Sequence, residues 1–391
     1  MLAGLLFATD DADDAPDRLV ATLPFGGATL IEYQARLLIA AGAAHLLIVV
    51  ARLTPELLGA INRIAKRGVA VDAVRNAAEA EEKLHPLSQL LVLGSGLVTT
   101  ADILAQMAQG EGDALLVTTE QDALPGLERV SRAAIWAGIA RFDAARLAAV
   151  ARLPRDYDFQ STLLRVGAQS GAVQIALPAG PPRAGHGVEH GAARLRALSE
   201  ATLSALVCAD APLVDRVVIA PPARALLPWL LRRQIGTAVP VLAAMAMLAL
   251  ALLLAGFGMA AAGLPMLALA QVALACGTAL AMMRDEEGLA RLQGWLAGAG
   301  LAAMLVLIGL REWQAEAALA ALVAAGATAL IASFATRAAP QPPRWQPSPA
   351  AYALLLLPFA AAGQVFAGLI AAGGYAALAL GVGIERLRKN A

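Results

Sequence analysis

Charged, aromatic and cysteine residues are all scarce in this sequence. Only 15% of its 391 residues are charged and 4% are aromatic, whereas 59% are hydrophobic. The formal net charge of zero excludes the overall positive field with which many proteins bind nucleic acid, so we expect no nucleic-acid partner. Two cysteines, Cys208 and Cys276, are too few for a disulfide framework or a zinc site, and we expect both to be small buried side chains.

The hydrophobic residues are unevenly distributed along the chain. Up to about residue 235 the charges are interspersed normally, and beyond it apolar runs of membrane-spanning length dominate. A helix needs about 20 apolar residues to cross a bilayer. We therefore expect a cytoplasmic soluble domain over residues 1–178, a linker with juxtamembrane helices over 179–235, and a membrane domain over 236–391.

Six membrane spans are predicted, at about residues 237–259, 264–283, 294–310, 315–335, 350–367 and 369–385. Basic residues concentrate in the loops on one side of these spans, and the opposite loops contain only Arg311. Because basic loops stay in the cytoplasm, we expect a multi-pass protein of a bacterial-type inner membrane with both the soluble domain and the C-terminus cytoplasmic. The basic residues behind this orientation are Arg232, Arg233, Arg284, Arg291, Arg337, Arg344, Arg386, Arg388 and Lys389.

The first 178 residues alternate strand-like and helix-like segments. Helical periodicity marks residues 29–43 and 101–110. This alternation predicts a three-layer α/β domain built on a parallel sheet. The strand-like segments are LAGLLFA, HLLIVVA, VAVDAV, QLLVLG, DALLVT and VQIAL.

Residues 178–191, PAGPPRAGHGVEHG, have the proline and glycine content of a loop. His186 and His190 are possible metal ligands there, but a solvated loop is the preferred interpretation because the sequence shows no partner ligand. Further on, Trp229 with Arg232 and Arg233 fits a helix that lies on the membrane surface.

The stretch RDEEGLARLQGWLAGAG, residues 284–300, carries acids and an Ala-Arg pair between the second and third predicted spans. With six spans, this layout resembles the CDP-alcohol phosphotransferases, whose signature reads D-x-x-D-G-x-x-A-R, then eight residues, then G-x-x-x-D-x-x-x-D. Ala290, Arg291 and Gly300 stand in register with that signature. The resemblance implies an all-α membrane domain that joins an alcohol to a CDP-linked phosphate with two divalent ions.

The acids of that signature are mostly absent. Glu286 stands at the second acidic position, whereas Met283, Met304 and Ile308 occupy the other three, and Glu287 replaces the glycine. Methionine and isoleucine offer no oxygen to a hard cation. We therefore expect no metal and no catalysis at this site, and Mg or Mn only if an alternative set of ligands such as Asp285, Glu286 and Glu287 acts together.

Residues 24–50, PFGGATLIEYQARLLIAAGAAHLLIVV, resemble a segment of the sugar-phosphate nucleotidyltransferases, as do residues 133–150. The resemblance implies a GT-A or Rossmann-like nucleotidyltransferase fold over residues 1–178. Bifunctional enzymes place such a domain ahead of a CDP-alcohol phosphotransferase, which is the order found here.

The nucleotide-binding residues of that family are also missing. Its glycine-rich phosphate loop is replaced by TDDADDAPDR, residues 9–18, whose five aspartates repel a triphosphate. The metal-binding Asp expected after the QLLVL strand falls in Gly94-Ser95-Gly96. Arg18 and Asp158 remain as weak candidates, and Asp156 and Asp158 are more typical of a helix N-cap and a surface acid.

The preferred hypothesis is a non-catalytic pseudoenzyme that partners or regulates an active enzyme of phospholipid or phospho-polyol headgroup synthesis. We expect membrane lipid as a partner, and a homodimer or a heterodimer with an active paralogue. Two alternatives stay open. One is an active transferase with rearranged ligands, and the other is a lipid-binding or transport component.

Overall fold

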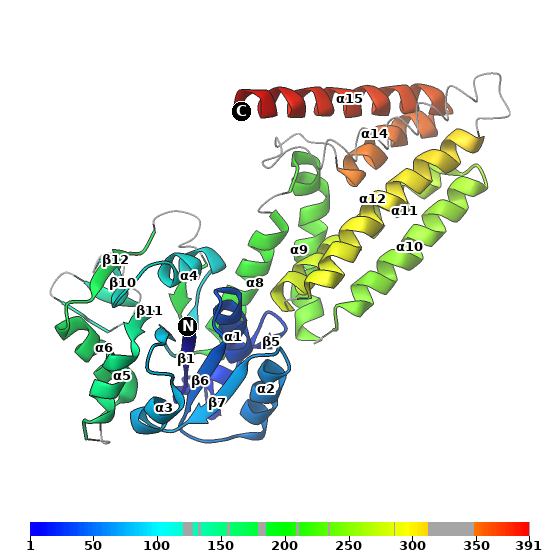
Figure 1. Cartoon of the computed structure of the whole chain (residues 1–391). Coiled ribbons are helices and arrows are strands. Elements are labelled where there is room, and N and C mark those ends of the chain that lie inside the picture. The colour runs from blue at the N-terminus through cyan, green and yellow to red at the C-terminus, as the bar shows by residue number, and fades with distance from the viewer. Residues whose placement is uncertain are drawn as a thin grey trace. The chain divides into compact units, whose positions relative to one another are not determined.

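The computed structural model describes residues 1–119, 128–131, 134–154, 157–178, 185–208, 211–233, 235–284, 286–311 and 348–390. The chain divides into two compact units, Met1–Ser199 and Glu200–Ala391. The first is an α/β unit and the second is all-helical (Figure 1).

A seven-stranded sheet with the order β12-β10-β11-β8-β1-β6-β7 forms the centre of the first unit. Its neighbours are parallel except for β11, which runs antiparallel to both β8 and β10. The prediction of a wholly parallel sheet is therefore wrong at one strand. β11 starts at the end of the sheet where β10 finishes, so the two neighbouring strands run in opposite directions. The strands are β1 (Leu2–Ala8), β6 (His45–Val50), β7 (Ala70–Val74), β8 (Gln89–Leu93), β10 (Ala114–Thr118), β11 (Ile135–Asp143) and β12 (Val173–Ala176).

Helices cover both faces of this sheet, which makes three layers (Figure 1). Alternate residues of β1 point to opposite faces. Phe7 belongs to the core that includes residues of α3, α5 and α6, whereas Gly4 lies against Leu38 of α1 on the other side. The six strand-like segments are confirmed, as is the helical periodicity at residues 29–43 and 101–110. The helices are α1 (Leu30–Ala40), α2 (Pro55–Ala65), α3 (Ala77–Lys83), α4 (Ala101–Ala108), α5 (Ala144–Ala151) and α6 (Phe159–Gln169).

Residues 185–199, expected to belong to a linker, pack on the first unit instead. β13 (Gly187–Val188) pairs with β9 (Leu97–Val98), and Ser199 of α8 (Ala192–Cys208) accepts a hydrogen bond from Gly26 N at 2.9 Å. The acidic loop after β1 is likewise ordered as the hairpin of β2 (Asp11–Ala12) and β3 (Ala15–Leu19). It leads through η1 (Val20–Thr22) to the small hairpin of β4 (Pro24–Phe25) and β5 (Ala28–Thr29).

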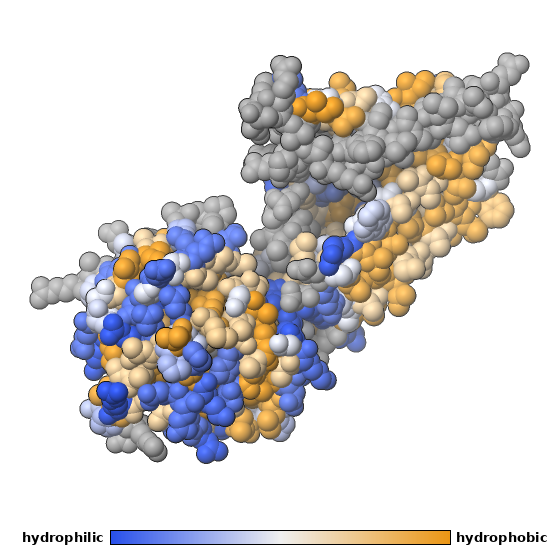
Figure 2. Space-filling view, in the orientation of Figure 1, coloured by the Kyte–Doolittle hydropathy of each residue, from blue (hydrophilic) through white to orange (hydrophobic). Residues whose placement is uncertain are grey.

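The second unit begins within α8, at Glu200, and continues with one π-helical turn, η3 (Asp215–Ile219), followed by α9 (Ala220–Arg232). Its apolar helices expose hydrophobic side chains along much of their described surface in Figure 2. These helices are α10 (Ala238–Gly256), α11 (Ala260–Arg284), α12 (Glu287–Arg311), α14 (Pro349–Ala361) and α15 (Val365–Asn390).

Within the described residues, four helices are long and apolar enough to cross a membrane, not the six that were predicted. They are Ala238–Gly256, Ala260–Arg284, Gly288–Leu310 and Val365–Val382. The predicted span at 315–335 lies outside the described residues. The span predicted at 350–367 is the 13-residue helix α14, because the break falls at Gly363, whose φ of 72° ends the helix.

Candidate functional site

The motif positions of the second unit do not converge on one point. The chain turns between α11, which ends at Arg284, and α12, which begins at Glu287. Met283 is therefore at the end of one helix, and Met304 lies 17 residues into the next, about 26 Å along it at the helical rise of 1.5 Å per residue. Carboxylates at these positions would be too far apart to share two ions separated by a few Å.

Met304 and Ile308 lie in an apolar core. They are 0% and 3% exposed, and they pack among residues of α10, α11, α14 and α15 such as Leu267, Leu356 and Ala372. Gly300 allows a close approach of α10 to α12, since a side chain at this position would meet Leu248. These residues therefore stabilise the packing of the helices.

Glu286 is bound to the start of α10. It accepts a hydrogen bond from the hydroxyl of Thr237, and Arg284 donates to the carbonyl of Ile235 at 3.0 Å. Ala290 and Arg291 follow in the first two turns of α12, and Asp285 lies outside the described residues. The hydrogen bonds of Arg284 and Glu286 therefore connect the turn between α11 and α12 to the residues just before α10.

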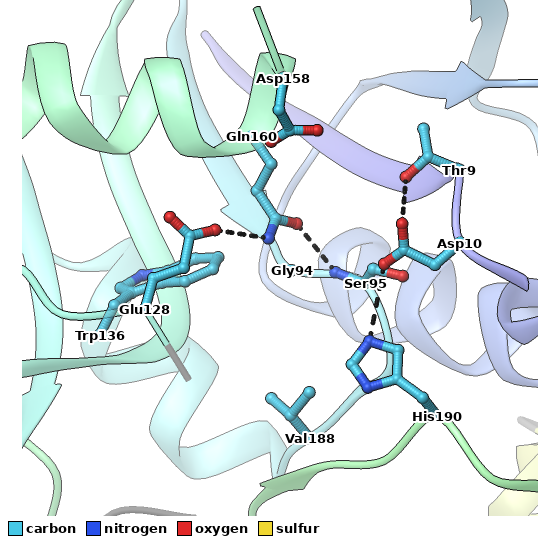
Figure 3. A pocket seen from close by; sticks show the side chains of 10 residues that line it. All are labelled: Thr9, Asp10, Gly94, Ser95, Glu128, Trp136, Asp158, Gln160, Val188 and His190. Carbon is cyan, nitrogen blue, oxygen red and sulfur yellow. Dashed lines mark hydrogen bonds and ion pairs between the residues drawn. The ribbon is translucent and has the colours of Figure 1, made fainter. Parts of the chain in front are cut away.

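A pocket lies in the first unit at the carboxyl ends of the parallel strands β1 and β8. From β1 the chain proceeds to β6 on one side and later returns to β8 on the other side. Such a reversal of strand order leaves a crevice between the loops that follow the two strands, where open α/β sheets bind ligands. The cavity has a volume of about 230 Å³, and its lining residues are Thr9, Asp10, Gly94, Ser95, Glu128, Trp136, Asp158, Gln160, Val188 and His190 (Figure 3).

Asp10 and His190 form an ion pair at one side of the pocket. His190 Nε2 lies 3.6 Å from Asp10 Oδ2, and Thr9 Oγ1 donates to Asp10 Oδ1 at 3.1 Å. The contact with His190 lowers the pKa of Asp10 against the opposing effect of burial. The same contact raises the pKa of His190, again against burial, and the charges of Asp13 and Glu189 add to the increase. His190 is therefore not in a solvated loop.

Gln160 bridges the centre of the pocket. Its Oε1 accepts a hydrogen bond from Ser95 N at 3.1 Å, and its Nε2 donates to Glu128 Oε1 at 3.3 Å (Figure 3). Gln160 is held by the first turn of α6, whose N-cap is Asp158 with Ser161 N donating to Oδ1 at 2.8 Å. A helix N-cap was expected from the pair Asp156 and Asp158. Asp158 is the N-cap of α6, and its side chain also lines the pocket.

Trp136 packs against Gly94, and both residues line the pocket. A side chain added at Gly94 would lie 2.8 Å from Trp136 Cη2, so an aspartate at position 94 would require the ring to move. Gln34 of α1 fixes this loop by donating to the carbonyls of Gly94 at 3.2 Å and Leu97 at 2.8 Å. The lack of a side chain at Gly94 therefore leaves room for the ring of Trp136.

Other sequence candidates lie apart from the pocket. Arg18 is exposed on β3 and is absent from the pocket lining. His186 is partly buried, with Nδ1 2.9 Å from Thr99 Oγ1 and Nε2 2.7 Å from the carbonyl of Ala137. Asp156 lies outside the described residues. The solvated-loop interpretation is wrong for His186 as well, because β13 pairs with β9 and carries the histidine onto the sheet.

Neither site has a donor set suited to Mg or Mn. The signature positions of the second unit lie apart and hold two methionines and an isoleucine. In the pocket, Asp10 is paired with His190 and Asp158 caps α6. Across the described residues, no three His, Cys, Asp or Glu side chains are close enough to share an ion.

Sequence reasoning missed most of the pocket residues. Asp10 and Ser95 carried a signal, because each directly follows a strand that borders the reversal of strand order. Glu128, Gln160 and His190 come from distant segments, and the sequence does not indicate that they meet.

No protein-family model and no curated protein matches this sequence. Among solved structures, a UDP-glucose pyrophosphorylase in complex with UDP-glucose is similar with a TM-score of 0.39 and 12% identity, over 52% of this chain and 98% of that one. The inositol-1-phosphate CTP transferase from T. maritima is similar with a TM-score of 0.35 and 13% identity, over 45% of this chain and 85% of that one. Both are nucleotidyltransferases and match the N-terminal part. At these low scores, the roles of the pocket residues rest on their own geometry.

Proposed function

We propose that the protein is an integral membrane pseudoenzyme that acts by binding rather than by catalysis. The observation that carries this proposal is the pocket at the reversal of strand order, which is lined by Asp10, Glu128 and Asp158. Nucleotidyl transfer requires that such a crevice hold a triphosphate, and three carboxylates repel its charge. The volume of about 230 Å³ is also below the roughly 300–1,000 Å³ of typical ligand pockets.

The second unit supports the same proposal. Phosphotransfer with two ions requires several carboxylates within a few Å of one another. Met304 and Ile308 instead pack in an apolar core, and the side chain of Glu286 is bound by Thr237. Among the described residues, neither the pocket nor the signature positions of the second unit supply the groups for chemistry on a CDP-linked substrate.

A binding role in a membrane requires a surface through which the protein associates. The four long apolar helices expose large hydrophobic side chains such as Leu242, Leu253 and Leu378. We propose that these helices associate with lipid and with an active enzyme of phospholipid or phospho-polyol headgroup synthesis, as a homodimer or a heterodimer. The soluble domain and the C-terminus would face the cytoplasm of an inner membrane.

An activity assay on the purified full-length protein in detergent or nanodiscs tests the absence of catalysis. CTP or UTP is supplied with sugar and polyol phosphates and Mg or Mn, and pyrophosphate and CMP release are measured. We expect no product above the protein-free control. Product formation that is lost in both Asp10→Asn and Glu286→Gln would show an active transferase and overturn the proposal.

A reconstitution assay tests the regulatory role. The protein is extracted gently, and native mass spectrometry identifies co-purifying transferases and lipids. A co-purified transferase is then assayed in vesicles with and without the added protein, and we expect its rate or lipid product to change. A bound lipid alone, with no effect on any transferase, favours the lipid-binding alternative.

A further inference from the structure

A helical segment ahead of the first long apolar helix has an apolar outer face. The chain is helical without a break from residue 213 to residue 232, through η3 and α9. Residues four positions apart lie on the same face of a helix, and the π-helical turn of η3 offsets part of the drift that this spacing produces at 3.6 residues per turn. Five apolar, exposed residues follow this spacing and are called the outer stripe below: Leu213, Val217, Pro221, Ala225 and Trp229.

The opposite face of the same segment packs within the second unit. Apolar residues there are buried, and Cys276 of α11 donates through Sγ to the carbonyl of Ala223 at 3.7 Å. The segment is therefore fixed to a helix that is itself long and apolar enough to cross a membrane. The outer stripe faces away from this contact, with Val217 65% and Trp229 48% exposed. The buried residues are Ile219, Ala220, Ala223, Leu227 and Leu230.

The segment ends at one edge of the apolar helices. α10 begins at Ala238, and Arg284 at the end of α11 donates to the carbonyl of Ile235, just after α9, at 3.0 Å. Cys276 lies eight residues before that end, about 12 Å along α11. Since α11 has 25 residues and is about 37 Å long, it exceeds the roughly 30 Å hydrocarbon core of a bilayer by about 7 Å. With this surplus at the end that carries Arg284, the contact with Ala223 lies within a few Å of the boundary between headgroups and hydrocarbon.

Arginines lie beside the outer stripe. Residues 211–236 contain four arginines and one aspartate. The aspartate, Asp215, accepts a hydrogen bond from Ser348 Oγ at 2.5 Å, whereas Arg224 and Arg233 are exposed. A guanidinium matches the geometry of a phosphate and binds it through two parallel hydrogen bonds. The segment therefore combines an apolar face with positive charge, as helices that bind anionic membrane surfaces do.

Neither water nor the hydrocarbon core suits this combination. In water the outer stripe would leave its hydrophobic side chains in contact with solvent. In the hydrocarbon core the arginines would lose their hydration, which is costly. At the boundary the stripe reaches hydrocarbon while the arginines reach the headgroups, and Trp229 is of the residue type enriched at that depth. The boundary therefore satisfies both faces of the segment.

We propose that η3 and α9 form an interfacial helix that binds an anionic bilayer surface. The outer stripe inserts at the boundary between headgroups and hydrocarbon, and Arg224 and Arg233 bind headgroup phosphates. The sequence indicated a membrane-surface helix only around Trp229, whereas the structure defines the exposed face and extends it to Leu213. The inference rests on the membrane association within the proposed function, and not on the absence of catalysis.

Site-directed spin labelling of the full-length protein in nanodiscs tests the position of the outer stripe. The nanodiscs contain phosphatidylcholine and phosphatidylglycerol, the native cysteines are replaced by alanine, and a nitroxide is attached at Val217→Cys or Ala225→Cys. Collision rates are measured with oxygen, which concentrates in hydrocarbon, and with a water-soluble nickel complex. We expect oxygen to dominate at both positions. Leu242→Cys on α10 is the control for lipid contact, and Glu82→Cys on the exposed surface of α3 is the control for water.

Lipid selectivity tests the arginines. Electron paramagnetic resonance of spin-labelled lipids measures the preference of the protein for phosphatidylglycerol over phosphatidylcholine. We expect Arg224→Gln and Arg233→Gln each to reduce this preference by up to about fivefold, the effect of removing one basic residue near an anionic surface. Arg18→Gln makes the same change on exposed β3 of the first unit and should have no effect. Gel filtration and far-UV circular dichroism confirm that each variant is folded.

Three results would overturn the inference. One is a collision rate with the nickel complex that is as high at Val217 and Ala225 as at Glu82. Another is exclusion of both reagents together with spin–spin broadening, which would show that a second copy of the chain covers the stripe. The third is a preference for phosphatidylglycerol that is unchanged in both arginine variants. If the label at Leu242 is also reached mainly by the nickel complex, the membrane association itself fails, and the proposed function fails with it.

Discussion

Polar residues that interrupt the hydrophobic pattern behave differently in the two units. In the first unit, Asp10, Glu128 and His190 come from distant segments and meet around one cavity. In the second, the motif positions are spread along the chain, with Glu286 just before α12, Arg291 in its second turn and Gly300 near its middle.

The difference follows from how sheets and helices place their side chains. Parallel strands bring all their carboxyl ends to one edge, so residues far apart in sequence meet there. A straight helix separates residues by 1.5 Å along its axis for every position. Residues spaced along α12 therefore form a site only if a neighbouring helix places polar or ligating side chains beside them. Met304 and Ile308 instead contact apolar residues of the neighbouring helices.

The largest effect is expected from restoring an acid to the membrane unit. Met304→Asp should destabilise the protein strongly, since a charge at the centre of a membrane helix costs about 2.5–3.5 kcal/mol. Thermal unfolding in detergent measures the effect, with Met304→Leu as the apolar control. A stable Met304→Asp variant that binds Mn would show that the signature positions do form a site, and would remove the contrast between the units.

Arg141 provides the next largest effect, in the first unit. Its guanidinium is 4% exposed and donates to four backbone carbonyls, those of Met107, Gln109, Glu111 and Gly112. Arg141→Met leaves these acceptors without a donor and should lower the free energy of unfolding by about 2 kcal/mol. Denaturant unfolding measures the change. Arg18→Leu, on the exposed face of β3, is the control and should change it little.

Asp158 should show a smaller effect that separates its two roles. Asp158→Ala removes the N-cap of α6 and should cost about 1 kcal/mol, whereas Asp158→Asn keeps a cap acceptor and should cost less. Thermal unfolding of both variants measures the difference. Equal destabilisation would indicate that the charge of Asp158, rather than its capping hydrogen bond, stabilises the unit.

The smallest effect is a pH dependence at the pair of Asp10 and His190. Because the pKa of His190 is raised above its usual value of 6.5, its contribution is present below that value and is lost as pH rises through the raised pKa. The pKa of Asp10 is lowered, so its contribution is present above its usual 3.8 and is lost as pH falls through the lowered pKa. The pair therefore stabilises the segment most in weakly acidic solution.

Hydrogen exchange of residues 187–191 follows this dependence. After correction for intrinsic exchange rates, we expect protection to decrease as pH rises above 6.5, and His190→Gln to make it independent of pH in this range. Protection that increases over the same range in the unmodified protein would contradict the ion pair.

Much of the first unit was predictable from sequence. The six strand-like segments and two helical patterns match the structure closely, because buried strands and amphipathic helices leave strong periodic signals. The antiparallel β11 was indicated only by the resemblance of residues 133–150 to a known segment. The pocket was not predictable beyond Asp10 and Ser95, since the proximity of Glu128 and His190 depends on the packing of separate loops.

The sequence by itself determined the division into an α/β part and an apolar helical part, the identity of the main strands, and the presence of methionine and isoleucine where the resembled signature carries acids. Only the tertiary structure decided that the acidic stretch after β1 is an ordered hairpin whose Asp10 pairs with His190, and that the membrane motif is spread along a helix. Local periodicity depends on neighbouring residues, whereas the convergence of side chains depends on where the chain turns. The place where the chain turns between α11 and α12 is not encoded in the spacing of the motif.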